Sequence, residues 1–166
     1  MLLFRPVDSV ESIAEVARLA REIWQEYYVP IIGQKQVDYM LEQFQSERAV
    51  TAQLAQSYEY YLVCHDRGNA GYFAIVPNAG EATLLLSKIY VRKSERGHGF
   101  GKKILEFVED LAQKRAIKLL WLTVNKNNGA SISWYSRMGF RNAGVVLQDI
   151  GAGFVMDDFR MIKTIT

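Results

Sequence analysis

Apolar residues recur every three or four positions over the first third of the chain, the spacing that places them along one face of an α-helix. This spacing predicts three helices, over Ser9–Tyr28, Gln34–Phe44 and Glu47–Gln56. A capping box of Asp8 and Glu11 is expected to open the first helix, and Pro30 and Gly33 are expected to end it. The first third is therefore predicted to be helical.

Beyond Ser57 the pattern changes to short runs rich in β-branched and aromatic residues. Three strands are predicted, EYYLVC over 59–64, AGYFAIV over 70–76 and ATLLLSKIYV over 82–91. The connecting segments HDRGN and PNAG hold the Asp, Asn, Pro and Gly residues that tight turns favour. We therefore expect the three strands to form an antiparallel meander.

The remainder of the chain alternates between the two patterns. The predicted elements are a helix over Phe100–Arg115, a strand over Lys118–Val124, a helix over Ala130–Met138 and strands over Asn142–Gln148 and Phe154–Thr164. A strand, a helix and a second strand in succession place the two strands parallel, so ATLLLSKIYV and KLLWLTV should be parallel. The order predicts an α/β (α+β) fold, with a mixed, mostly antiparallel sheet of about six to seven strands flanked by helices.

Length and composition fit a single domain over residues 1–166. A net charge of +2 is too small to indicate a nucleic-acid partner, so any anion site must be local. Two histidines and one cysteine offer no ligand spacing for a metal. The sequence has no run of ~18 apolar residues that would span a membrane, and the single Cys64 fits a reducing compartment. We therefore expect a cytoplasmic protein without a membrane partner.

The stretch RKSERGHGFGKK, from Arg92 to Lys103, lies between a predicted strand and a predicted helix. The first amides of a helix are unpaired and carry a partial positive charge, and glycines at 97, 99 and 101 let a large anion approach them. The stretch therefore favours a phosphate or pyrophosphate site. The dinucleotide pattern G-x-G-x-x-G and the Walker pattern are both absent. A tight turn with solvated Lys and Arg side chains is the alternative interpretation.

Two motifs together resemble those of the Gcn5-related N-acetyltransferase (GNAT) superfamily. Residues 96–101, RGHGFG, are similar to the family's R/Q-x-x-G-x-G/A signature, which binds the pyrophosphate of acetyl-CoA. Residues 128–140, NGASISWYSRMGF, are similar to its N-x-x-A-x-x-x-Y-x-x-x-G-F motif, with Ser131 in place of the alanine. The order of predicted elements also resembles the GNAT fold, in which a splayed pair of parallel strands forms the cofactor cleft.

The resemblance implies that acetyl-CoA is the co-substrate, and it assigns the residues that would hold it. The backbone of Ile89, Tyr90 and Val91 would bind the pantetheine arm in the manner of an added strand. Asn128 would cap the following helix and reach the pantetheine. The pyrophosphate would lie against Arg96, Gly97, His98, Gly99, Phe100, Gly101 and Lys102. An ordinary buried strand and a purely structural cap are the alternatives.

The same resemblance assigns Tyr135 to catalysis. A phenol at the sulfur can donate a proton to the departing CoA thiolate, whereas packing against Trp134 and Phe140 is the alternative. Many relatives carry a glutamate base on the strand before the glycine loop or on the next strand, where this chain has Ser87 and Thr123. Neither residue can act as a base. We therefore expect the amine to lose its proton through ordered water, with Ser87 or Thr123 in the relay.

Two groups of residues are candidates for binding the acceptor. Trp24, Tyr27 and Tyr28 lie near the end of the first predicted helix. Asp157 and Asp158 are adjacent in the last predicted strand, so one of them should face inward and need a partner. Together with the run SKIYV, these features resemble the bacterial polyamine acetyltransferase subgroup, which implies a small cationic amine as the acceptor. Core packing of the aromatic residues and turn stabilisation by the aspartates are the alternatives.

The resemblance thus predicts transfer of an acetyl group from acetyl-CoA to a primary amine, by direct attack in a ternary complex. A protein N-terminal or lysine acetyltransferase is the enzymatic alternative. A non-catalytic acyl-CoA-binding sensor is a further alternative, which the missing carboxylates at Ser87 and Thr123 favour and the retained Tyr135 disfavours. Paired C-terminal strands often support dimers in this fold, so the resemblance also allows a homodimer.

Overall fold

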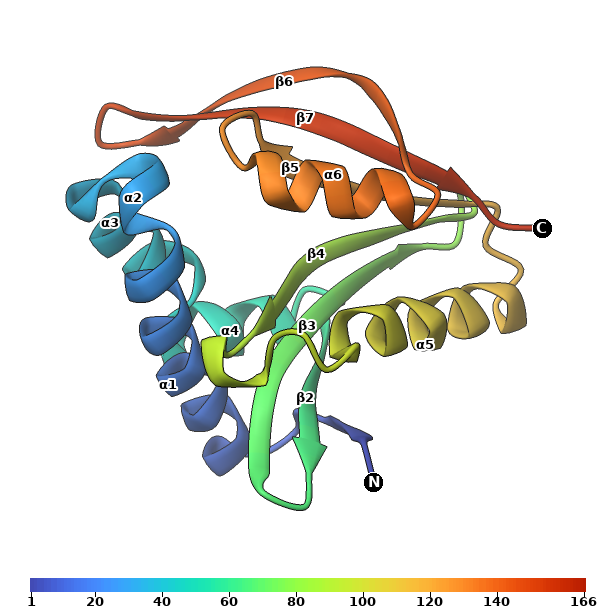
Figure 1. Cartoon of the computed structure of the whole chain (residues 1–166), viewed down its shortest axis with the longest axis horizontal. Helices are drawn as coiled ribbons and strands as arrows, with labels where there is room; N and C mark the ends of the chain where they lie inside the picture. The colour runs from blue at the N-terminus through green and yellow to red at the C-terminus, as the bar shows by residue number, and fades with distance from the viewer. The chain divides into compact units, whose positions relative to one another are not determined.

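The computed structural model describes every residue from Met1 to Thr166, and Figure 1 traces the chain. Its strands are β1 (Leu3–Pro6), β2 (Glu59–His65), β3 (Gly68–Asn78), β4 (Thr83–Val91), β5 (Leu119–Asn125), β6 (Arg141–Gly151) and β7 (Phe154–Thr164). Its helices are α1 (Val10–Tyr27), α2 (Val29–Ile32), α3 (Gln34–Phe44), α4 (Glu47–Leu54), α5 (Phe100–Lys114) and α6 (Gly129–Arg137), with a 3₁₀ turn η1 (Lys93–Glu95).

The chain forms two compact units. Unit 1 consists of Met1–Val76 and Lys88–Ile104, and unit 2 consists of Pro77–Ser87 and Leu105–Thr166. The hydrogen-bonded strand order is β1-β2-β3-β4-β5-β7-β6, and β4 supplies residues to both units. The predicted mixed, mostly antiparallel sheet is confirmed, with seven strands.

Helix α1 begins at a cap that differs from the prediction. The Ser9 hydroxyl accepts a hydrogen bond from the Ser12 backbone N–H at 3.1 Å, and the Ser12 hydroxyl accepts from the Ser9 backbone N–H at 3.0 Å. The predicted box of Asp8 and Glu11 is therefore wrong by one residue. A short serine hydroxyl can close the reciprocal pair that a glutamate makes in the common version of this motif.

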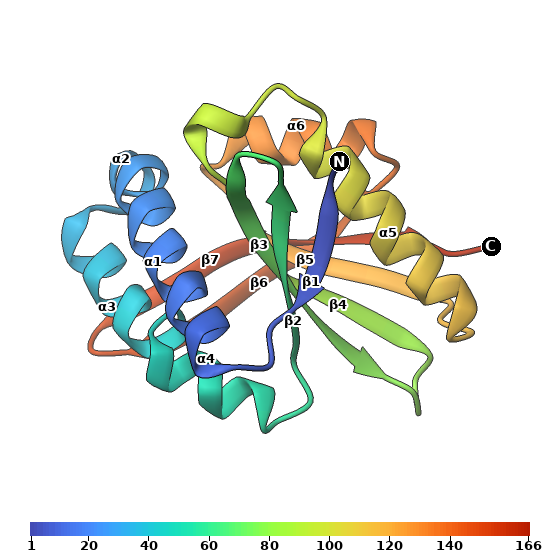
Figure 2. The ribbon, with the colours of Figure 1, turned by 90° about the horizontal axis from the view of Figure 1, so that it is seen from below.

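Unit 1 places α1 to α4 beside the antiparallel strands β1, β2 and β3, which lie side by side in Figure 2. Helix α1 packs on α3 and α4. The β2–β3–β4 region is closely packed, because a Cβ on Gly71 would lie 2.1 Å from the Tyr90 carbonyl oxygen. Only glycine permits that approach between β3 and the end of β4.

Unit 2 contains the predicted parallel pair. The β4–β5 ladder joins Thr83, Leu84 and Leu85 to Leu119, Leu120 and Trp121. Strand β5 then pairs antiparallel with β7, and β7 with β6, which Figure 1 shows as one long hairpin. Lys163 on β7 donates to the Met138 carbonyl at the end of α6 at 2.8 Å, so α6 lies on the face of β7 that carries Lys163.

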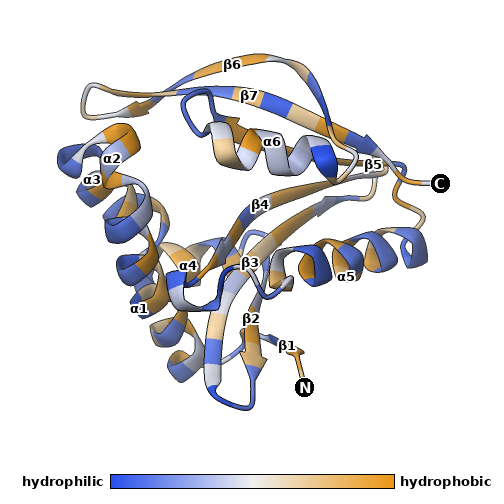
Figure 3. Cartoon of the chain, in the orientation of Figure 1, coloured by the Kyte–Doolittle hydropathy of each residue, from blue (hydrophilic) through white to orange (hydrophobic).

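The remaining predicted elements are all found, two of them with both ends as predicted (Gln34–Phe44 and Phe154–Thr164) and the others with ends shifted by at most three residues. Figure 3 shows hydrophilic and hydrophobic residues alternating along α5, as the predicted helical periodicity requires. Its buried positions are Ile104, Leu105, Val108 and Ala112. The sequence pattern missed β1, because four residues ending in Pro6 are too short to show an alternation. No helix is long and apolar enough to cross a membrane.

Candidate active site

The glycine loop in unit 1 has the backbone shape of an anion site. Gly97 and Gly99 have φ angles of +83° and +76°, in the region that favours glycine, and a Cβ on either would meet no atom within 4 Å. Helix α5 begins at Phe100 directly after them, so the first amides of the helix lie next to an open, side-chain-free surface. Gly101 lies within the first turn, and Lys102 is exposed there.

Arg96 at the start of this loop is held by α1. Its two terminal nitrogens donate to the two carboxylate oxygens of Glu26 at 3.0 and 2.8 Å, and its Nε donates to the Val91 carbonyl at 3.0 Å. The guanidinium also lies over the Tyr27 ring at 5.0 Å. A bidentate pair of this kind fixes the loop's first residue. No local pattern predicts this pairing, because Glu26 is 70 residues away from Arg96 along the chain.

A second anchor of the loop was also missed from the sequence. The Glu95 carboxylate lies 3.3 Å from His65 Nε2 and 3.6 Å from Arg67, both at the β2–β3 hairpin. His98 is exposed, and its Nδ1 lies 3.1 Å from the Glu95 carbonyl oxygen. The two residues directly before Gly97 are thus each held by another part of unit 1.

The predicted acceptor residues of α1 form one aromatic group with the end of β4. The Trp24 ring lies 4.4 Å from Tyr28 and 5.6 Å from Tyr90, and Tyr27 lies 5.0 Å from Tyr28. Trp24 is buried, so core packing accounts for that residue. Tyr27, Tyr28 and Tyr90 are half-buried, as are Ile89 and Val91.

In unit 2, Asn128 caps α6 and Tyr135 lies within it. The Asn128 side chain accepts from the Ser131 backbone N–H at 3.3 Å, so the predicted cap is confirmed, and the residue is 3% exposed. Tyr135 is 8% exposed, and its ring meets Phe140 edge-on at 5.6 Å and Trp134 at 5.1 Å. The packing of Tyr135 against Trp134 and Phe140 is therefore observed, and it is compatible with a catalytic role of the Tyr135 hydroxyl.

Ser87 and Thr123 lie on the same face of the sheet in unit 2. The β4–β5 ladder ends at the pair Leu85 and Trp121, and Ser87 and Thr123 each follow two residues later. Side chains two residues apart in a strand share a face. Both residues are half-buried, and they mark the point on their strands where the parallel ladder has stopped.

The two adjacent aspartates of β7 have opposite surroundings. Asp157 is exposed and pairs with Lys126 at 2.7 Å, whereas Asp158 is 4% exposed and hydrogen-bonds to the Thr123 side chain. Burial raises the pKa of the Asp158 carboxyl to about 6, although the Thr123 hydrogen bond opposes the shift. The turn-stabilising alternative is wrong, since both residues lie inside β7.

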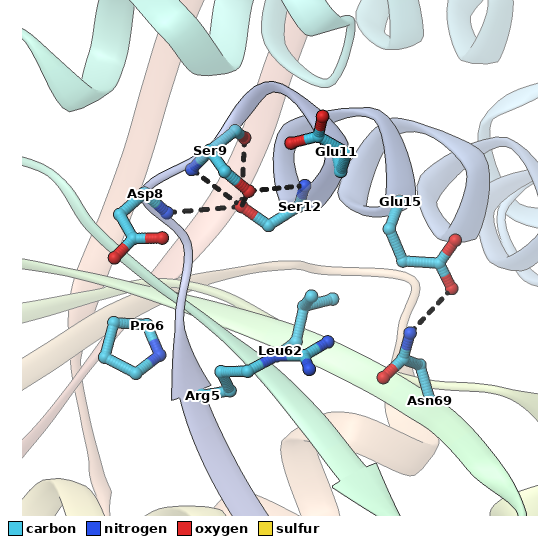
Figure 4. Close-up of a pocket in the computed structure, with 9 residues that line it drawn as sticks. All are labelled: Arg5, Pro6, Asp8, Ser9, Glu11, Ser12, Glu15, Leu62 and Asn69. Carbon is cyan, nitrogen blue, oxygen red and sulfur yellow. Dashed lines mark hydrogen bonds between the residues drawn. The ribbon is translucent and has the colours of Figure 1, made fainter.

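A pocket of about 510 Å³ in unit 1 contains none of the predicted site residues. Figure 4 shows it between β1, the start of α1, β2 and β3. Four of its polar side chains pair with one another: Ser9 with Ser12, and Glu15 with Asn69 at 2.9 Å. The hydrogen bond from Arg18 holds the pKa of Glu15 below its usual value. These pairings mark the pocket as a surface recess of the fold.

A profile of the Acetyltransferase (GNAT) family matches residues 17–140, about three quarters of the chain. The chain belongs to this family. Among GNAT relatives, the [ribosomal protein bS18]-alanine N-acetyltransferase of Escherichia coli K12 is 33% identical over 61% of each chain. The spermidine N(1)-acetyltransferase of Thermoplasma acidophilum is 22% identical over 90% of this chain and 92% of that protein.

The structure of a GNAT enzyme has the same fold. The crystal structure of PaiA N-acetyltransferase from Thermoplasma acidophilum, in complex with coenzyme A, superposes with a TM-score of 0.79 over 99% of both chains at 19% identity. The streptothricin acetyltransferase of Streptomyces lavendulae is also 33% identical, over 55% of this chain and 48% of that protein. This chain therefore spans about half to three fifths of the length of the 33% identical relatives. Family and fold are thus shared, while the acceptors of these relatives differ from one another.

Proposed function

We propose that this GNAT protein transfers the acetyl group of acetyl-CoA to a primary amine, most simply that of a small cationic molecule such as a polyamine, by direct attack in a ternary complex. The observation that carries the proposal is the open surface at Gly97 and Gly99, next to the first amides of α5. A pyrophosphate fits this surface, because no side chain obstructs it and the helix end attracts an anion.

The donor would be held by residues of both motifs, RGHGFG and NGASISWYSRMGF, and of the strand before them. Backbone groups of Ile89, Tyr90 and Val91 would pair with the pantetheine arm, and Asn128 would bind the same arm while it caps α6. The pyrophosphate would lie on the loop from Arg96 through Gly97, His98, Gly99, Phe100 and Gly101 to Lys102. The short β4–β5 ladder supports the strand-like mode, since the second half of β5 has no β4 partner in it.

Tyr135 would protonate the departing thiolate. An alkyl thiolate is a poorer leaving group than the thiol, and a phenol within hydrogen-bonding distance of the sulfur can supply the proton as the C–S bond breaks. Ser87 and Thr123 would take part in removing the proton of the amine. Their shared face at the end of the parallel ladder supports placing them in one relay.

The acceptor is proposed to be cationic because of Asp158. A buried carboxylate without a cationic partner favours a positively charged guest. Tyr27 and Tyr28, which are half-buried, and Trp24 behind them would add an aromatic wall for the alkyl part of an amine. The full-length similarity to a spermidine acetyltransferase supports the same choice.

Acetylation of a protein N-terminus is a second candidate function. Its support is the 33% identity to the bS18-alanine N-acetyltransferase, although that match covers 61% of each chain. The two candidates differ in the acceptor alone, because both use an amine and acetyl-CoA.

An assay of CoA thiol release separates the candidates. The panel contains spermidine, a diamine, a monoamine and a peptide with an N-terminal alanine, each with acetyl-CoA at pH 8. We expect the polyamines to give the highest kcat/KM, and Tyr135→Phe to lower kcat by about 100-fold with little change in the Kd for acetyl-CoA. Faster turnover of the peptide would support the second candidate. Binding of acetyl-CoA without release by any acceptor would contradict both.

A further inference from the structure

Asp158 is the only carboxylate among the buried polar and charged residues of the chain. The others are Gln45, Lys88 and Asn128. Its neighbour Asp157 is half exposed, with 52% of its side chain accessible, and is neutralised by Lys126. Adjacent carboxylates with such different surroundings point to a specific role for the buried one, because a buried charge without a counter-ion costs free energy.

The register of the sheet fixes where Asp158 points. Asp158 pairs with Asn125, and Arg160 pairs with Thr123 across β5 and β7. Directly opposed residues in an antiparallel pair share a face, so Asp158 lies on the face that carries Thr123. The Thr123 hydroxyl is hydrogen-bonded to the Asp158 carboxyl. This is also the face of Ser87, so Ser87, Thr123 and Asp158 lie on one face of the sheet, past the last pair of the β4–β5 ladder at Leu85 and Trp121.

The cations near Asp158 have other partners. Arg160 stands two residues along β7, but its guanidinium lies over the Trp121 ring at 4.5 Å, on the side of Thr123 away from Asp158. Lys126 pairs with Asp157 and lies over the Phe159 ring at 5.8 Å. Strand β6 places Val146 opposite Asp158, and β5 adds only the neutral Thr123 and Asn125 on this face.

We propose that Asp158, oriented by Thr123, is the general base that removes the proton of the acceptor ammonium. The assignment rests on the proposed function. Asp158 supplies the carboxylate that Ser87 and Thr123 lack. It lies on β7, the strand that pairs with β5. Thr123 acts as a positioning residue, since its hydroxyl holds the carboxyl and has no basic lone pair of its own at neutral pH.

The proton balance of the step is complete. A substrate ammonium R–NH₃⁺ gives one proton to Asp158, and the freed lone pair of nitrogen forms the new C–N bond at the thioester carbonyl carbon. The C–S bond breaks, and Tyr135 gives its proton to the sulfur. The second proton of the nitrogen then replaces the proton that Tyr135 has lost. Asp158 releases its proton to water. The sum is R–NH₃⁺ plus acetyl-CoA giving the N-acetyl amine, CoA–SH and one H⁺.

The test is the pH dependence of kcat/KM from pH 5 to pH 9.5, with spermidine as the amine. In the wild type, kcat/KM should fall below about pH 6, because burial raises the pKa of Asp158 to about 6 and the protonated acid cannot accept a proton. Asp158→Asn should lose about 100-fold at pH 7. That loss should shrink steadily towards pH 9.5, since the free amine then needs no base.

Three comparisons make the result decisive. Asp110→Asn is the control, because Asp110 is an exposed carboxylate of α5 in the same unit that pairs with Lys114 at 2.7 Å, and the variant should stay within about threefold of the wild type at every pH. Thr123→Val should move the acid limb to higher pH, because it removes the hydrogen bond that lowers the pKa of Asp158. Asp158→Asn should keep the wild-type Kd for acetyl-CoA by calorimetry, which shows that the variant is folded.

Each contrary outcome has a definite meaning. A loss in Asp158→Asn that is equal at every pH, or confined to KM with kcat unchanged, would show that the carboxylate anchors the amine and would overturn its assignment as the base. An active wild type with an equally active Asp158→Asn variant would also overturn it, while leaving the proposed function intact. A wild type that acetylates no amine would remove the proposed function and this assignment together.

Discussion

One lysine and one aspartate are buried in this protein, Lys88 in unit 1 and Asp158 in unit 2, and their surroundings differ. Lys88 is 6% exposed, and its ammonium donates to the Phe44 carbonyl, to Gln53 Oε1 at 3.0 Å and to the Tyr60 hydroxyl. All three of its donors are thus satisfied. Asp158 has the Thr123 hydroxyl as its side-chain partner, although a carboxylate can accept about four hydrogen bonds.

The difference separates a structural charge from a reactive one. Burial lowers the pKa of Lys88 to about 7 and raises the pKa of Asp158 to about 6, so desolvation disfavours the charged form of both. Lys88 joins the end of α3, helix α4 and β2 with neutral acceptors and has no free donor for a ligand. Asp158 retains lone pairs for one. The number of satisfied hydrogen bonds, more than the pKa alone, distinguishes their roles.

The largest effect on stability is expected at Gly71 on β3, which lies against the Tyr90 backbone of β4. Gly71→Ala would place a Cβ 2.1 Å from the Tyr90 carbonyl oxygen, a backbone atom that cannot turn aside as a flexible side chain can. We expect a loss of about 3 kcal/mol in the free energy of unfolding, measured by urea denaturation. Gly80→Ala is the control, because its Cβ would meet only the Asn78 side chain at 3.6 Å. A loss below about 1 kcal/mol at Gly71 would show that this region is loosely packed.

Lys88→Met should remove a pH dependence of stability. The pKa of Lys88 is about 7 in the folded chain, well below its ordinary value of 10.5, because the ammonium is desolvated. Between these values the unfolded chain binds the extra proton, so the stability of the wild type should rise with pH by at most about 1.4 kcal/mol per pH unit. The variant should lack this rise in denaturation curves from pH 7 to pH 10.

The Lys88→Met variant also allows the contributions of Lys88 and Asp158 to catalysis to be compared, through kcat/KM. Lys88→Met should keep kcat/KM within about threefold, whereas Asp158→Asn should lose about 100-fold at pH 7. A large loss of rate in Lys88→Met, with an unchanged Kd for acetyl-CoA, would contradict the purely structural role of Lys88.

The smallest expected effect is a gain in thermal stability when the charge of Asp158 is removed. The pKa of Asp158 is about 6 in the folded chain and 3.8 in its ordinary state, because burial penalises the carboxylate. The folded chain binds the extra proton between these values, so stability falls as pH rises from about 4 to about 6. Asp158→Asn should therefore melt about 2–4 °C higher than the wild type at pH 8 and equally at pH 4. A lower melting temperature at pH 8 would indicate that Asp158 stabilises the fold.

Local patterns predicted the elements, because periodicity and caps are local. The strand before RGHGFG, the helix after it and the cap at Asn128 all follow from neighbouring residues. The Ser9 cap was missed by one position, since Asp8, Ser9 and Ser12 all have side chains that can cap a helix and only the backbone course selects among them.

Long-range partners could not be predicted in the same way. The pairing of Arg96 with Glu26 depends on how α1 meets the glycine loop within unit 1. The burial of Asp158, and the exposure of Asp157 beside it, depend on the register of β7 against β5. A one-residue slip would exchange the two aspartates between faces, so the sequence could show that one carboxylate faces inward but not which one.

We expect the protein to form an N-acetyl amine from acetyl-CoA. The direct measurement is quantitative mass spectrometry of both products after incubation with spermidine and acetyl-CoA at pH 8. We predict one N-acetylated amine for every CoA released, with both products formed about 100-fold more slowly by Tyr135→Phe. Release of CoA without an acetylated amine, or binding of acetyl-CoA with neither product, would contradict the account.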